Sequence, residues 1–201
     1  MAAVKLTKTE LKRQKDALKR YRRYLPTLIL KKQQLQMVIR QLEGRLADET
    51  LKRKELSEGA ASWLDLFAEP FPFRDWLRVK SVQIESTNVA GVEIPVFKSM
   101  DYMTTSHDLF MTPPWVDEAL LLFAKLSRLD MEIGLLHRQI SLLGAELRVT
   151  SQRVNLFEKV KIPQALENIR KIHIYLGDQQ TAAVVRGKIA KNNLLRRADA
   201  S

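Results

Sequence analysis

The sequence predicts a mainly α-helical protein in which an N-terminal and a C-terminal helix form a long antiparallel two-helix coiled coil. A small central head with a short β-hairpin lies between these helices. Two observations support this prediction: apolar residues recur at steps of three and four toward both ends of the chain, and all three tryptophans with five of the seven prolines fall between residues 59 and 115. We therefore divide the chain into an N-terminal coiled-coil helix (1–58), the head (59–113), a C-terminal coiled-coil helix (114–178) and a basic C-terminal tip (179–201).

Composition excludes several classes of protein. Of the 201 residues, 45% are hydrophobic, which rules out wholesale disorder, and the absence of cysteine rules out disulfides, thiolate metal sites and a cysteine nucleophile. The net charge of +11 is uneven, with +9 in residues 1–58, −3 in 59–113 and +5 in 114–201. The first 25 residues have no apolar core of a secretory signal, and the longest apolar run, Ala119–Ala124, is too short to span a bilayer. We expect a soluble intracellular protein.

The first helix is predicted between Thr9 and Ser57. Its apolar residues follow a heptad pattern, which is typical of one stripe of a left-handed coiled coil about 70 Å long. Pro26 lies inside this helix and is expected to kink it, because proline removes one backbone hydrogen bond. The predicted seam consists of Leu11, Leu18, Tyr21, Leu25, Leu28, Leu35, Ile39, Leu42, Leu46 and Leu56.

The second helix is predicted to begin after Thr112, a capping residue followed by two prolines that suit a first helical turn. Near Pro163 we expect the seam to slip by one residue, and Gly177 is a plausible end of the helix. A weaker helix is expected from about Thr181 to Leu195. The predicted seam consists of Leu122, Leu126, Leu129, Ile133, Leu136, Ile140, Leu143, Leu147, Thr150, Val154 and Phe157, continued by Ile162, Leu166, Ile169, His173 and Leu176.

A long amphipathic helix needs a partner of similar length, and each helix supplies one for the other. If the head reverses the chain, the numbers of facing residues should add to roughly 177, an estimate that rests on equal helical rise. The segment beyond about residue 170 should then extend past the N-terminus without a partner.

The middle segment favours a β-hairpin. Short runs rich in valine and isoleucine flank Ala90-Gly91, which supplies turn chemistry, and Pro95 requires an edge or bulge position. Residues 98–111 are interpreted as loop. Aromatic and aliphatic residues between Trp63 and Leu77 form either a compact cluster or a patch for a partner.

Sequence signatures of catalysis are missing. No two glycines lie within two residues of each other, so no phosphate-binding loop is predicted, and the three histidines, His107, His137 and His173, lack metal-ligand spacing. The sequence contains no motif that would bring a nucleophile, a base and an orienting group together. We expect a non-catalytic chain without cofactor or metal.

Two basic clusters are the strongest remaining signal. Nine lysines and arginines lie between Lys5 and Arg23, and five more lie between Arg186 and the C-terminus. The clusters either keep a long helix soluble or dock into an acidic partner, such as phosphates, lipid headgroups or an acidic protein surface. A basic coiled-coil nucleic-acid-binding protein is thus an alternative, although few aromatic residues interleave with the charges. The clusters also lack the Trp/Phe face that direct membrane insertion would need.

Three stretches carry a family resemblance: Leu6–Leu11 followed by Leu30–Lys32, the hairpin stretch Asn88–Pro95, and Arg153–Glu158 followed by Ile162-Pro163. With these motifs in order over the whole chain, the sequence resembles the D subunits of V-type (V/A-type) rotary ATPases, the rotor subunits of the central stalk. It differs from the family pattern in having Pro26 and a short, sparsely charged tail.

The resemblance implies a rotor shaft that couples ATP hydrolysis or synthesis to rotation of a membrane ring and to proton or sodium transport. Its implied partners are a catalytic hexamer of A and B subunits, the small F subunit of the stalk and a funnel-like subunit that joins the membrane ring. It also implies a cytoplasmic location, peripheral on the membrane within the ATPase complex. No nucleic acid is expected as a partner.

Three groups of candidate residues follow. The coil signature consists of Arg153, Val154, Asn155, Glu158, Ile162 and Pro163; its polar members either hold the helices in register or are ordinary surface residues. The bearing tip consists of Lys8, Lys12, Arg13, Arg186, Lys188, Lys191, Arg196 and Arg197; these side chains either contact a bearing or only confer solubility. The partner-facing head consists of Val89, Val92, Ile94 and Phe97; these either contact a partner or close the head's own core.

Overall fold

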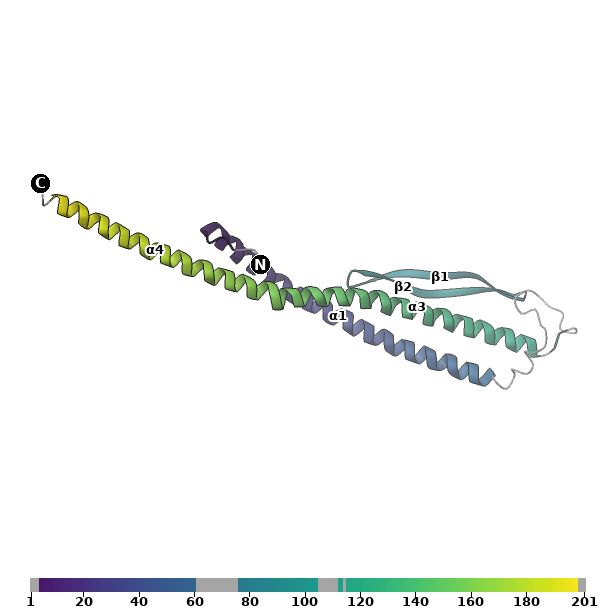
Figure 1. The fold of residues 1–201 in the computed structure, drawn as a ribbon. Helices are drawn as coiled ribbons and strands as arrows, with labels where there is room; N and C mark the ends of the chain where they lie inside the picture. Colours follow the sequence, from purple (N-terminus) through teal and green to yellow (C-terminus); the bar gives the residue numbers. More distant parts are fainter. Residues whose placement is uncertain (1–3, 61–75, 105–111, 114, 199–201) are drawn as a thin grey trace. The chain divides into compact units, whose positions relative to one another are not determined.

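The computed structural model describes residues 4–60, 76–104, 112–113 and 115–198, with side chains as far as residue 196. In chain order the elements are α1 (Lys8–Ala60), β1 (Leu77–Val89), β2 (Val92–Thr104), α3 (Trp115–Leu156), the π-helical turn η3 (Phe157–Lys161) and α4 (Ile162–Ala198) (Figure 1). The predicted fold, long N- and C-terminal helices around a β-hairpin, is confirmed. Most of the predicted aromatic cluster after Trp63 lies outside the described residues.

The chain divides into two compact units, which we call the terminal unit and the hairpin unit. The terminal unit comprises Met1–Leu30 with Thr150–Ser201, and the hairpin unit comprises Lys31–Val149. Both α1 and α3 contribute residues to each unit.

In the hairpin unit, α1 and α3 lie side by side and run antiparallel (Figure 1). The Lys31 ammonium lies 2.7 Å from the Glu146 carboxylate, and the residue numbers of this pair add to 177, as predicted. The Arg53 guanidinium lies 2.5 Å from the Asp130 carboxylate, and the numbers of that pair add to 183. Residue numbers thus rise along one helix as they fall along the other.

The predicted seam forms the core of this unit. Leu35 and Leu143 are fully buried and Leu42 is 7% exposed, because heptad spacing brings these side chains to the face that each helix turns to its partner. Ile94 of β2 completes the buried cluster. Half-buried side chains packed against the cluster are Val38, Ile39, Val89, Ala90, Val92, Leu136, Ile140 and Leu147.

The β-hairpin has strands of 13 residues joined by a two-residue turn. Ala90 and Gly91 have φ of 52° and 83°, a conformation that glycine adopts without strain, and the Gly91 N–H donates to the Asn88 side-chain oxygen across 2.9 Å. The predicted turn is therefore confirmed. The predicted loop is wrong for residues 98–104, which form the second half of β2 and pair with β1 as far as Leu77↔Thr104.

In the terminal unit, α1 pairs with the end of α3, with η3 and with α4. The rings of Tyr21 and Phe157 lie 5.2 Å apart, and Val154 and Ile172 are buried. The predicted seam is wrong at Leu166, which is 43% exposed, and at His173, which is also exposed. Ala165 and Ile172 are buried in their place, whereas the predicted positions Ile162, Ile169 and Leu176 are half-buried.

The helix end predicted at Gly177 is also wrong. α4 runs without interruption from Ile162 to Ala198, and the Thr181 hydroxyl donates to the Gly177 carbonyl oxygen across 3.1 Å inside this helix. Every described side chain from residue 177 to residue 196 is exposed except that of Ala182, which is half-buried. Burial of Ile172 moves the start of the unpaired segment a few residues beyond the predicted 170.

Candidate partner-binding surfaces

The coil signature lies where α3 passes into α4. Val154 is 5% exposed and belongs to the seam, and Ile162 is half-buried. Arg153, Asn155 and Glu158 are exposed, with Pro163 also on the surface. The polar members of the signature thus present hydrogen-bonding groups to solvent rather than to the described part of the chain.

The π-helical turn at Phe157–Lys161 explains the register of the seam beyond it. Proline at position 163 has no N–H, and its ring would clash with the carbonyl group four residues earlier in a regular α-helix. The turn widens instead, and the Ile162 N–H bonds to the Phe157 carbonyl oxygen, five residues back. The extra residue in the turn rotates α4 about its axis, so that Ala165 and Ile172 face the partner helix.

The first part of the bearing tip lies on the opening turns of α1. The Thr7 side-chain oxygen accepts from the Glu10 N–H across 3.2 Å, a helix cap that was not predicted, although Thr7 and Glu10 have the spacing of a capping box. Lys8, Lys12 and Arg13 are exposed, and Arg13 makes a 3.7 Å ion pair with Glu10.

The second part of the tip lies on the unpaired length of α4. Arg186, Lys188, Lys191 and Arg196 are exposed, and nothing is described of the Arg197 side chain. The Tyr21–Phe157 contact sets residue 8 opposite about residue 170, so Arg186 lies about 24 Å farther along the helix at the usual rise. The two basic groups therefore occupy successive lengths of the same end of this unit.

The hairpin residues proposed to face a partner contact the protein's own helices. Ile94 is 4% exposed in the core, Val89 and Val92 pack against that core, and the Arg128 guanidinium lies over the Phe97 ring at 5.5 Å. The exposed apolar side chains of the hairpin are Val79, Ile84 and Met103.

Hydrogen bonds attach the hairpin to α3. The buried Gln139 side chain donates to the Pro95 carbonyl oxygen across 2.5 Å. The Tyr102 hydroxyl donates to the Ala124 carbonyl oxygen across 2.6 Å and lies 2.9 Å from the Ser127 hydroxyl. These residues were not predicted from the sequence. The one signal for Gln139 was its position next to the apolar seam, where a polar side chain needs a hydrogen-bond partner.

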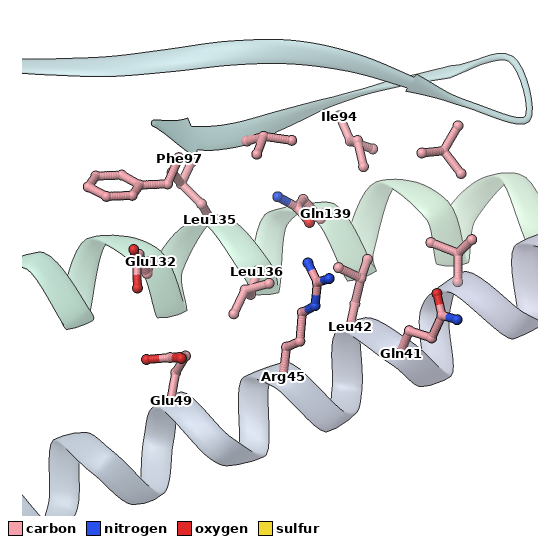
Figure 2. Close-up of a pocket in the computed structure, with 13 residues that line it drawn as sticks. Gln41, Leu42, Arg45, Glu49, Ile94, Phe97, Glu132, Leu135, Leu136 and Gln139 are labelled. Carbon is pink, nitrogen blue, oxygen red and sulfur yellow. The ribbon is translucent and has the colours of Figure 1, made fainter. Parts of the chain in front are cut away.

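A cleft of about 510 Å³ opens between α1, α3 and the β-hairpin (Figure 2). Its floor is apolar, formed by Leu42, Leu135, Leu136, Ile94 and Phe97 among others. Its charged side chains are Arg45, Glu49 and Glu132.

The two carboxylates among these side chains form ion pairs. Lys52 donates to the Glu49 carboxylate across 2.7 Å, a hydrogen bond that raises the pKa of Lys52, and Arg128 lies 3.7 Å from Glu132. On the same helices the hydrogen bond to Asp130 raises the pKa of Arg53. The basic side chain of each of these pairs is exposed, so the pairs define geometry more than they add stability.

Within the described ranges, the structure contains no cluster of three or more histidine and carboxylate side chains placed to hold a metal ion. None of the helices in that part of the chain combines the length and apolar character needed to cross a bilayer. The candidate sites in the described residues are therefore surfaces that could bind a partner: the exposed basic end of α4 and the hairpin that packs on the helix pair.

Comparison with known proteins identifies the family. The family model described as the D subunit of ATP synthase matches residues 10–192, which include the whole hairpin, all of α3 and all but the outer ends of α1 and α4. The chain belongs to this family. The D-subunit match leaves Lys8, Arg196 and Arg197 of the bearing tip outside its limits.

Curated relatives agree with the family model. The chain is similar to the V-type ATP synthase D subunit of Borreliella burgdorferi, with 53% identity over 98% of each chain. It is also similar to the V-type ATP synthase D subunit of Chlamydia abortus, with 33% identity over 98% of this chain and 97% of the relative, and to that of Chlamydia pneumoniae, with 32% identity over 97% and 95%. The resemblance inferred from the motifs is confirmed at the level of the D-subunit family.

Proposed function

We propose that this chain is the central rotor shaft of a V/A-type ATPase, a non-catalytic subunit that couples ATP hydrolysis or synthesis to rotation of the membrane ring and to proton or sodium transport. The observation that carries this proposal is the helix contact at Tyr21 and Phe157 in the terminal unit of a D-subunit family member, beyond which α4 continues with exposed side chains. A paired helix resists bending and twisting better than a single helix, as a shaft must.

The proposed partners are those that the resemblance to the D-subunit family implies. The ends of α1 and α4 enter the cavity of a hexamer of A and B subunits, where the basic tip contacts the bearing. The hairpin unit binds the small F subunit of the stalk, and the funnel-like subunit connects the shaft to the membrane ring. The chain thus acts at the membrane periphery, on the cytoplasmic side.

Coupling in this proposal is a difference in contact energy. Lys188 and Lys191, three residues apart, share one face of α4, and Arg186 lies on the opposite face, so the helix presents different side chains to different catalytic interfaces. A contact that stabilises one open or closed state more than another shifts the population toward that state. Turning the shaft then moves each interface through its states in sequence.

A truncation after Leu176 tests the proposal. The described side chains that it removes are exposed, apart from the half-buried Ala182, so the remaining helix pair should keep its helix content and melting temperature. In the reconstituted ATPase the truncated chain should let ATP hydrolysis continue with reduced ion transport per ATP. Wild-type coupling with the truncated chain would contradict the proposed role of this helix end.

A further inference from the structure

The seam of the terminal unit takes one irregular step, at the π-helical turn. Its positions follow one another at steps of three or four residues as far as Phe157, and the next position, Ile162, comes five residues later. In an uninterrupted α-helix the stripe would continue through Lys161, Gln164 and Asn168, which are polar. The sequence therefore contains one residue more than a regular helix accommodates here, and the π-helical turn absorbs it.

The backbone of this turn is weaker than that of the helix on either side. The Ile162 N–H bonds to the Phe157 carbonyl oxygen instead of to that of Glu158. Pro163, the next residue along the chain, has no N–H to offer. The Glu158 carbonyl group thus has neither of the two backbone donors that could close a helical turn on it. Glu158 and Pro163 are both exposed, so water can reach this part of the backbone.

The helix that faces this turn has a gap of its own at the same height. Pro26 lies inside α1 and provides no N–H for the Arg22 carbonyl oxygen, four residues earlier. The contact of Tyr21 with Phe157 sets Arg22 opposite about residue 156, directly before the π-helical turn. Each helix therefore lacks one backbone hydrogen bond at nearly the same height along the pair.

A weak turn in one helix of a pair is held straight when the facing helix is regular, and here neither helix gives that support. We propose that α1 between Arg22 and Pro26, together with Phe157–Ile162, forms a joint in the paired helices of the terminal unit. At this joint residues 8–20 and 163–176 tilt together as one body, and the basic residues farther along α4 move with them. The joint is a property of the chain itself and does not depend on the proposed function.

Amide hydrogen exchange of the full chain, followed by NMR, locates the joint. The amides of residues 158–162 should exchange at least about tenfold faster than those of residues 150–154 and also faster than those of residues 168–172. Fraying from the end of the pair gives a different profile, because exchange would then be faster at residues 168–172 than at the π-helical turn. That profile would overturn the joint and leave the proposed function intact.

A first variant makes α4 regular by combining deletion of Lys159 with Pro163→Ala, both at exposed positions. The seam then continues at steps of three and four residues, so exchange at the remaining amides of the turn should slow by about tenfold. The matched control combines Pro163→Ala with deletion of the exposed Arg170, which moves Ile172 off the seam and should speed exchange. Equal effects of the two deletions would contradict the extra residue assigned to the turn.

A second variant, Pro26→Ala, tests whether the two gaps act together. It restores the N–H that the Arg22 carbonyl oxygen lacks, at an exposed position where proline fills no space in the core. Exchange at residues 158–162, on the facing helix, should slow by about threefold or more. Slowing confined to α1 would show two independent weak turns and would overturn the shared joint. Circular dichroism verifies that each variant keeps its helix content.

Discussion

Gln139 of α3 and Pro95 of β2 are joined by a hydrogen bond in which the glutamine side chain donates to the proline carbonyl oxygen across 2.5 Å. Pro95 has no N–H to give to the strand ladder, yet its carbonyl group is used to attach the hairpin to the helix pair. Gln139 is 5% exposed and Pro95 is half-buried, so the bond is partly shielded from bulk water. A buried acceptor that lost this donor would be left without compensation.

Replacement of Gln139 by leucine should therefore lower the free energy of unfolding by about 1–3 kcal/mol. Leucine has a similar size but cannot donate to the Pro95 carbonyl oxygen. Gln41→Leu is the control: Gln41 lines the same cleft but is exposed, and its replacement should change stability by less than about 0.5 kcal/mol. Urea unfolding measures both values, and equal losses would show that the bond contributes nothing specific.

The contact between Tyr21 and Phe157 gives a second prediction. Tyr21→Ala should cost about 2 kcal/mol of unfolding free energy, because it removes a half-buried ring packed at 5.2 Å against another. Tyr24→Ala deletes the same side chain three residues later, where the ring is 54% exposed, and should cost much less. Thermal melting of the two variants compares them; a larger loss at Tyr24 would contradict the helix pairing in the terminal unit.

Two glycines should respond in opposite directions to alanine. Gly177 lies inside α4 with open space where a Cβ would be, so Gly177→Ala should stabilise the helix by about 0.5–1 kcal/mol. Gly91 has φ of 83°, where a Cβ is strained, so Gly91→Ala should destabilise the hairpin. Helix content and melting temperature measure these effects. A loss of helix in Gly177→Ala would restore the helix end that the sequence suggested.

The pH dependence at Glu167 is set by its neighbour. Lys171 donates a hydrogen bond to Glu167 across 2.7 Å and lowers the pKa of that carboxylate below its ordinary value. Because the folded pKa is depressed, the stabilisation is present above the unfolded pKa and is lost as the pH falls through the folded value. NMR titration of the Glu167 carboxyl carbon should show this depression, and Lys171→Ala should raise the pKa again. An unchanged titration in that variant would refute the assignment.

The helix pair could be predicted from sequence because its determinants are local and repeated. Leu35 and Leu42 stand seven residues apart on α1, and Leu143 belongs to the corresponding apolar stripe of α3. Equal helical rise then predicts which residues face each other, as the Lys31–Glu146 pair confirms. The Ala90-Gly91 turn was predictable for the same reason, since the backbone conformation of a tight turn depends on its own residues.

The remaining features depend on contacts between distant residues. The second half of β2 has little strand signal, and Tyr102 is held there by the Ala124 carbonyl oxygen on α3. The predicted seam after Pro163 failed at Leu166 and His173 because the size of a register shift depends on where the widened turn forms. A glutamine beside the apolar seam marked position 139, but nothing local in the sequence indicated that its partner would be the Pro95 carbonyl oxygen. Local propensity cannot report interactions that tertiary packing creates.

Rotation of this chain within the working enzyme tests the central claim most directly. The sequence has no cysteine, so Ser86→Cys on the exposed face of β1 would give one unique attachment point for a fluorescent or bead probe. With the catalytic hexamer fixed to a surface and ATP supplied, the probe should turn in one direction and pause at positions related by the threefold symmetry of the hexamer. Steady ATP hydrolysis with a stationary probe would contradict the account.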